Sequence, residues 1–137
     1  MTLDTYGHLI KGADAATPEA IASVLEKSLK FCSVAIMVLL VIAALGPAKW
    51  APRTALGWEV DHFVGYFAIT AFVCLAWPRP FVVGGVLMAI SVLLEGLQAL
   101  TPDRSSNLLA AVYGAGGALA AALLAELFIR AWKRRTG

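Results

Sequence analysis

The sequence predicts an all-α integral membrane protein of one domain, with four transmembrane helices in antiparallel up-down hairpins and both termini in the cytoplasm. Three observations lead to this fold class. The chain of 137 residues is 60% hydrophobic, whereas ordinary soluble domains are roughly 45 to 50% apolar. Four long apolar segments alternate with short polar ones, and the basic residues gather on one side of the resulting hairpins. The lipid bilayer is therefore the first expected partner.

The four predicted spans follow from the thickness of a bilayer. A hydrocarbon layer of ~30 Å needs about 20 helical residues at 1.5 Å each. The predicted spans are residues 29–48, 58–77, 81–100 and 108–131. The purely apolar parts of the second and third are short, so polar residues must lie at their ends. Four tryptophans fall at or beside the predicted ends, where amphipathic rings prefer to lie: Trp50, Trp58, Trp77 and Trp132.

The connections between these spans are short. The stretch "PRP", Pro78 to Pro80, allows only a tight turn, because proline ends one helix and begins the next. In the last span, small residues recur every four positions at Ala110, Gly114, Ala118 and Ala122. Such a face permits close helix packing. Glu126 and Arg130, one turn apart, are expected to form an ion pair at the interface.

The orientation follows from the basic residues. Eight of them share one side: Lys11, Lys27, Lys30, Arg79, Arg130, Lys133, Arg134 and Arg135. Three lie on the other: Lys49, Arg53 and Arg104. Because basic residues favour the cytoplasmic side, residues 1–28 and the basic tail 133–137 are predicted to be cytoplasmic.

Polar residues converge at the opposite, extracytoplasmic boundary. His62 begins the second span, Glu95 and Gln98 close the third, and Asn107 begins the fourth. The candidate ligand-binding residues are Glu59, Asp61, His62, Glu95, Gln98, Arg104 and Asn107, and the candidates for catalysis are His62, Glu95 and Arg104.

An acid within a span is costly, by about 2.5 to 3.5 kcal/mol at the helix centre and less toward an end. Glu95 is therefore expected to pair with Arg104 and to lie near His62. Such a cluster could bind an anionic or hydroxyl-bearing ligand or transfer a proton. It could equally be a polar network that joins the hairpins, and whether any reaction is catalysed stays open.

No cofactor, metal or nucleic-acid partner is predicted. Cys32 and Cys74 lie in apolar runs without the spacing of a metal site or of a disulfide framework. The glycine pairs Gly84-Gly85 and Gly116-Gly117 lie in apolar segments without the context of a phosphate-binding loop.

Three of these segments carry a family resemblance. "DHFVGYFAI" at 61–69, "EGLQALTPDR" at 95–104 and "YGAGG" at 113–117 resemble the signatures of VanZ-like membrane proteins over about residues 58–124. The departures are the absence of the lysine that usually precedes the histidine, and Asn107 and Ala111 where an Asp and an Asn are usual. The resemblance implies a multi-pass protein of the bacterial inner membrane, associated with glycopeptide (teicoplanin) resistance, with an envelope lipid or a glycopeptide as ligand.

The first residues carry a different resemblance. "TLDTYGHLIKGAD", Thr2 to Asp14, is similar to the C-terminal tail of tyrosine recombinases of the phage-integrase type, whose nucleophile would correspond to Tyr6. The groups that activate that tyrosine in the family are missing before it here, so Tyr6 is expected to be catalytically silent. An amphipathic helix on the inner membrane surface is predicted to follow, with Thr17 as its cap and Pro18 at its first position.

Two alternatives to an envelope-binding protein remain open at this stage. One is a small multidrug-type transporter subunit, although transport needs a charge near the membrane midplane and Glu95 lies near an end. The other is a vestigial structural membrane protein in which the polar residues serve only packing. The sequence also leaves homo-oligomer formation open.

The predicted orientation can be tested by cysteine labelling in intact cells, after removal of the two native cysteines. Single cysteines at Thr54 and Ser105 should react with impermeant thiol reagents added from outside, because both lie in predicted outer loops. A cysteine at Thr136 serves as the internal control and should not react. Labelling at position 136 alone would show that the orientation is the opposite of the predicted one and that the polar cluster faces the cytoplasm.

Overall fold

The described part of the chain forms four α-helices. The computed structural model describes residues 18–47, 55, 57–100 and 107–136. Each helix is long and apolar enough to cross a membrane, which confirms the all-α, four-span prediction. Their bounds are α2 Pro18–Leu45, α3 Trp58–Ala76, α4 Pro80–Gln98 and α5 Leu108–Thr136. The bounds of α3 and α4 lie within two residues of the predicted spans.

The two outer helices are longer than predicted. The predicted amphipathic segment and the predicted first span form one continuous helix, α2, of 28 residues, or about 42 Å. Neither proline nor glycine interrupts it after Pro18, which explains its continuity. α5 continues beyond Ala131 to Thr136, because basic side chains in a last turn favour the helix dipole. The placement of residues 18–28 along the membrane surface stays a prediction, and the integrase-like stretch lies outside the described residues.

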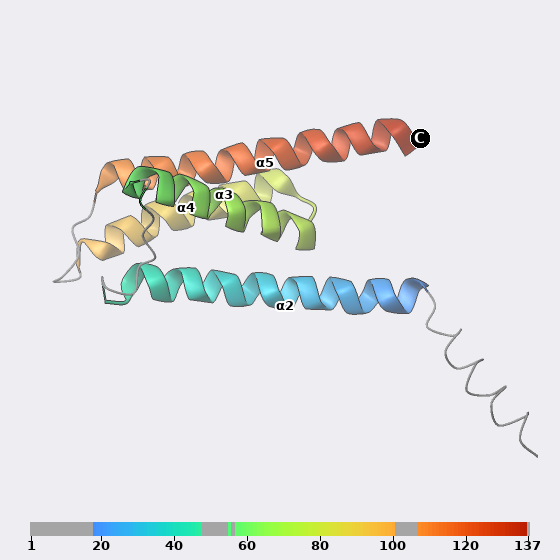
Figure 1. Ribbon diagram of the computed structural model, residues 1–137, viewed down its shortest axis with the longest axis horizontal. Coiled ribbons are helices and arrows are strands. Elements are labelled where there is room, and N and C mark those ends of the chain that lie inside the picture. The colour runs from blue at the N-terminus through green and yellow to red at the C-terminus, as the bar shows by residue number, and fades with distance from the viewer. Residues whose placement is uncertain (1–17, 48–54, 56, 101–106, 137) are drawn as a thin grey trace, which may run out of the picture.

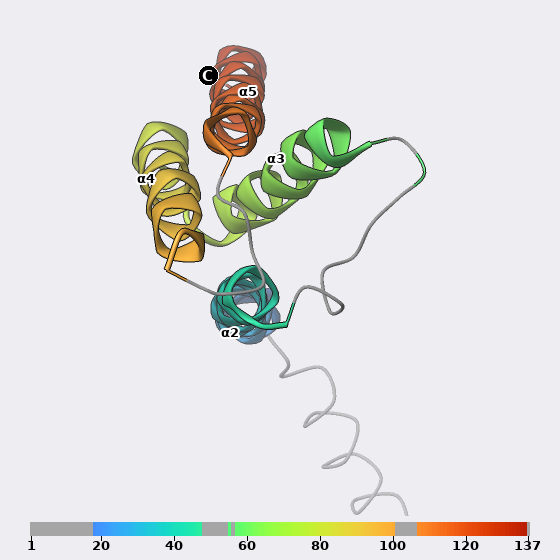
Figure 2. The same ribbon diagram turned by 90° about the vertical axis from the view of Figure 1, so that its left-hand side faces the viewer.

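The helices are arranged around the α3–α4 hairpin. Successive helices run in opposite directions along the long axis (Figure 1), and α2 and α5 lie on opposite sides of the hairpin (Figure 2). α5 packs closely against both α3 and α4, whereas α2 packs more loosely. In α2 only Ser33 is buried. The polar ends of α3, α4 and α5, where His62, Glu95 and Asn107 stand, therefore lie at one end of the bundle.

The predicted turn between α3 and α4 is confirmed. α3 ends at Ala76, and the amide of Trp77 donates to the carbonyl of Val73 at 2.9 Å. The amide of Arg79 then donates to the carbonyl of Trp77 at 2.7 Å, and Pro80 begins α4. A proline at the first helical position lacks only an N–H that has no helical partner there, so the turn reverses the chain without losing a hydrogen bond.

Small residues hold α5 against its neighbours. The predicted face of Ala110, Gly114, Ala118 and Ala122 is buried. A Cβ atom on Gly117 would overlap the carbonyl oxygen of Phe63 in α3, and one on Gly114 would overlap the Ser91 hydroxyl in α4. On α4, a Cβ on Gly84 would lie 2.6 Å from that of Ala122. The contact between α5 and the hairpin therefore requires backbone without side chains at these positions.

This requirement can be tested by comparing neighbouring glycines. Gly117→Ala should lower the free energy of unfolding by about 1 to 3 kcal/mol, because the added methyl group overpacks the α3–α5 contact. Gly116→Ala is the control, because its Cβ would lie 3.8 Å from the Phe63 ring and alanine favours a helix over glycine by about 1 kcal/mol. Thermal unfolding in detergent measures both. Equal stabilities of the two variants would contradict the proposed packing.

Candidate functional site

A cavity of about 360 Å³ lies between α2, α3 and α4. Its α2 wall is entirely apolar and consists of Ile36, Leu39, Leu40, Ala43 and Ala44. The facing wall carries polar side chains from α3 and α4: Asp61, His62, Tyr66, Ser91, Glu95 and Gln98. The cavity is therefore amphipathic across its width. Its most polar part lies at the end of the bundle where α3 begins and α4 ends (Figure 1).

His62 is held by the first turn of its own helix. Its Nδ1 atom lies 2.8 Å from the carbonyl oxygen of Trp58. Because a carbonyl only accepts, Nδ1 carries the proton, and Nε2 is the ring atom with a lone pair in neutral imidazole. The indole ring of Trp58 packs edge-on against the imidazole and also against the Tyr113 ring of α5, with centroid distances of 6.2 and 6.1 Å. The hydrogen bond to the Trp58 carbonyl and the contact with the Trp58 ring together fix the orientation of the imidazole.

Glu95 joins the end of α4 to the start of α5. The side chain is buried, and Oε1 accepts a hydrogen bond from the backbone amide of Asn107. The Asn107 side chain in turn accepts from the amide of Leu109 at 3.0 Å, as an N-cap residue does. A carboxylate beside the first amides of a helix is also favoured by the helix dipole. Glu95 and Asn107 therefore cap α5 together.

Gln98 makes the corresponding connection to α2. Its Nε2 atom donates to the carbonyl oxygen of Ala44 at 2.9 Å, in the last turn of α2. The last carbonyls of a helix have no partner within it, so this hydrogen bond satisfies one of them. Glu95 and Gln98, three residues apart on α4, thereby link its end to two different helices.

Tyr66 and Ser91 form the deeper polar part of the cavity. Both side chains are buried, and the Ser91 hydroxyl donates to the carbonyl of Ala111 at 3.2 Å. Both also lie against Gly114 of α5. They were not among the candidate site residues, although Tyr66 stands four positions after His62 and so shares its helix face. Ser91 lies one turn before Glu95, and the same spacing would have identified it.

The predicted site residues separate into three groups. Asp61, His62, Glu95 and Gln98 line one cavity. Asn107 meets Glu95 through its backbone but is not among the lining residues. Glu59 is turned back toward the start of α3, where its carboxylate lies 3.2 Å from the position of a Cβ on Gly57. Arg104 lies outside the described residues, so its pairing with Glu95 stays a prediction.

The chemistry of the cavity is that of hydrogen bonding and proton exchange. Two carboxyl groups, an imidazole, a phenol and an amide can all bind hydroxyl or amine groups. In the part of the chain that the structure describes, no three His, Cys, Asp or Glu side chains come together in a way that could hold a metal ion. Cys74 is buried in the core and Cys32 is exposed on α2.

No protein-family model, no curated protein and no solved structure matches this chain. The class that the fold defines is therefore a protein with four helices able to span a membrane, and any more specific function rests on the site itself.

The capping role of Glu95 leads to a stability prediction. Glu95→Ala should lower the free energy of unfolding by about 1.5 to 3 kcal/mol, because it removes a buried hydrogen bond to a charged group. Glu95→Gln should cost less, because an amide oxygen can still accept from Asn107. Glu126→Ala, at the opposite end, breaks an exposed pair with Arg130 and should change little. Thermal unfolding in detergent measures all three, and a Glu95→Ala variant as stable as Glu126→Ala would rule out the cap.

Proposed function

We propose that this protein is an envelope protein of the bacterial inner membrane that binds an amphiphilic envelope component in the cavity between α2, α3 and α4. The observation that carries the proposal is the division of that cavity into an apolar wall on α2 and a polar wall on α3 and α4. An amphiphile has the same division, with an apolar chain and a polar head. A ligand that is polar throughout would leave the α2 wall in contact with polar groups, which is unfavourable.

The polar wall favours a particular head group. Asp61, His62 and Glu95 supply acceptors, and none of the described lining residues is Lys or Arg. Carboxylates accept hydrogen bonds from hydroxyl and amine groups and repel anions. The described residues therefore favour a hydroxyl- or amine-bearing head over an anionic one. His62 is the group that could also act as a general base in a modification of that head.

The proposed location on the outer side rests on charge. Among the described residues, every Lys and Arg lies toward the end of the bundle remote from the cavity's polar part: Lys27, Lys30, Arg79, Arg130, Lys133, Arg134 and Arg135. The positive-inside rule assigns that end to the cytoplasm. The resemblance of residues 58–124 to VanZ-like proteins supports the same location and suggests a link to glycopeptide (teicoplanin) resistance.

One observation favours the structural alternative. Glu95 and Gln98 are both used in hydrogen bonds that join helix ends, so these two residues would be needed even without a ligand. His62 differs from them, because its hydrogen bond to the Trp58 carbonyl lies within α3. His62 is therefore the residue whose substitution best separates ligand binding from packing, and Asp61 lines the same wall of the cavity. Transport is less favoured, because Glu95 lies three residues before the end of α4 and caps α5.

The proposal is tested by expressing variants of this gene in a deletion strain and comparing them with the wild-type gene. His62→Ala and Asp61→Asn should each remove the difference in teicoplanin susceptibility between the wild-type and deletion strains, because the first removes the imidazole and the second replaces a carboxylate of the polar wall with a neutral amide. The amount of folded protein in the membrane should stay unchanged. Glu126→Gln, at the other end of the bundle, is the control and should behave as the wild type.

Two results would count against this function. If the deletion strain has unaltered susceptibility and an unaltered envelope-lipid profile, the proposed envelope function is wrong. A phenotype that survives in both His62→Ala and Asp61→Asn, while Glu95→Ala loses folded protein, would support the structural alternative.

A further inference from the structure

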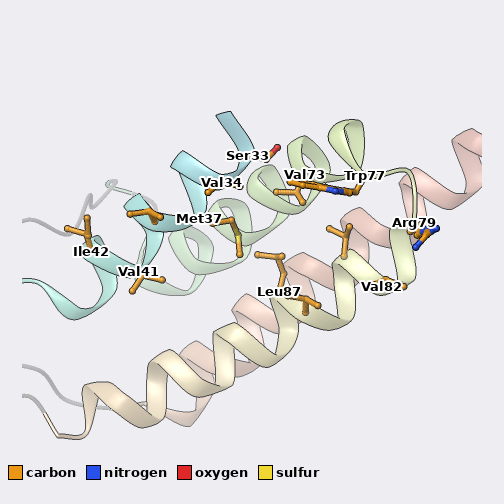
Figure 3. A pocket seen from close by; sticks show the side chains of 13 residues that line it. Ser33, Val34, Met37, Val41, Ile42, Val73, Trp77, Arg79, Val82 and Leu87 are labelled. Atoms are coloured by element: carbon orange, nitrogen blue, oxygen red, sulfur yellow. The ribbon is translucent and has the colours of Figure 1, made fainter. Parts of the chain in front are cut away.

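A second cavity, of about 600 Å³, lies between α2, the end of α3 and the first half of α4 (Figure 3). We call it the α2–α4 groove. Its lining is apolar apart from Ser33, Arg79 and the Trp77 ring nitrogen. Met37 of α2 and Leu87 of α4 point toward each other across it (Figure 3). It shares no lining residue with the cavity that contains His62.

The α2–α4 groove has a buried floor and an exposed rim. Val73, Val83 and Leu87 form its floor and are buried, with at most 7% of their surface exposed. Val82 and Val86, on its rim, remain 63% and 50% exposed. In a membrane these exposed side chains would face lipid. A lipid chain could therefore enter from the side without passing through the protein.

The mouth of the groove carries a cation, Arg79, that forms no salt bridge with any described residue. Arg79 lies at the N-cap position of α4, next to the interfacial ring of Trp77. The two salt bridges among the described residues are Lys30–Glu26 and Arg130–Glu126, and neither uses Arg79. None of the described residues that line the groove is acidic. The charge at the mouth is therefore complementary to an anion, such as a lipid phosphate.

The length of the groove matches one leaflet of a bilayer. Along α4 it extends from Arg79 to Leu87, which is about 12 Å at 1.5 Å per residue. Half of a ~30 Å hydrocarbon layer is about 15 Å. A transmembrane helix of a partner would need contacts across the whole layer, whereas one acyl chain ends near the midplane. The groove thus has the depth of a lipid chain rather than that of a spanning helix.

We propose that the α2–α4 groove binds an anionic phospholipid, with one acyl chain along Val83 and Leu87 and the phosphate group on Arg79. This site lies in the leaflet on the basic side of the protein, away from the polar part of the other cavity. It is independent of the function proposed for that cavity. The lipid would fill the space that the loose packing of α2 leaves beside α4.

The test compares two phospholipids with identical acyl chains. The purified full-length protein is delipidated in detergent and titrated with phosphatidylglycerol or phosphatidylcholine, and bound lipids are counted by native mass spectrometry. The wild type should bind one phosphatidylglycerol about fivefold more tightly than phosphatidylcholine, as expected for one basic residue near an anionic lipid. Arg79→Gln should remove this preference. Arg134→Gln, on the same basic side but outside the groove, should retain it.

A second variant tests the apolar part. Val86→Trp fills the groove from its exposed rim and should weaken the binding of both lipids. Val64→Trp on α3 is the matched control, because Val64 is similarly exposed, at 53%, and does not line the groove. Folding of each variant is checked by its unfolding temperature.

Three outcomes would overturn the proposal. The first is equal binding of the two lipids by the wild type, and the second is an unchanged preference in Arg79→Gln. The third is a dimer that binds no lipid and dissociates on Val86→Trp, because the occupant of the groove would then be a second copy of the chain.

Discussion

The close contact of α5 with α3 and α4 is the constraint on which the rest of the structure depends. Between apolar helices in lipid there is little hydrophobic driving force, so association relies on packing and hydrogen bonds. Gly114 and Gly117 allow the α5 backbone to touch Tyr66 and the Phe63 carbonyl. Gly84 allows the same approach to Ala122. The result is a three-helix unit in which Leu87 and Ala118 are almost completely buried.

The position of α2 follows from this unit. α5 occupies one side of the α3–α4 hairpin, so α2 can pack only on the other (Figure 2), where its own larger side chains, such as Met37 and Leu40, pack against the core. Its buried Ser33 hydroxyl lacks a hydrogen-bond partner among the described residues, which indicates weak docking. The two cavities lie on two faces of α2. The helix with the least packing thus forms a wall of both proposed binding sites.

The convergence of polar residues could be predicted in part. The depth of His62, Glu95 and Gln98 in their spans follows from hydropathy, and their gathering at one end follows from alternating helix directions. The contact of Glu95 with the Asn107 amide could not be predicted, and its predicted pairing with Arg104 lies outside the described residues. The sequence suggested Arg104 because the two charges are opposite, whereas the described contact is the Asn107 amide. That contact depends on how closely α5 approaches α4, which is a property of the glycines and of residues far away in the chain.

The sequence by itself determined the number of candidate membrane spans, the α3–α4 turn and the end of the bundle that carries the polar residues. These features depend on the lengths of the apolar segments, on the prolines of the α3–α4 turn and on the alternating direction of successive spans, all of which can be read from the sequence. Only the tertiary structure decided that Glu95 caps α5, that Gln98 binds the end of α2 and that a groove opens beside Arg79. Those features depend on the rotation of each helix about its axis and on the distance between helices, which are set by packing among side chains distant in sequence.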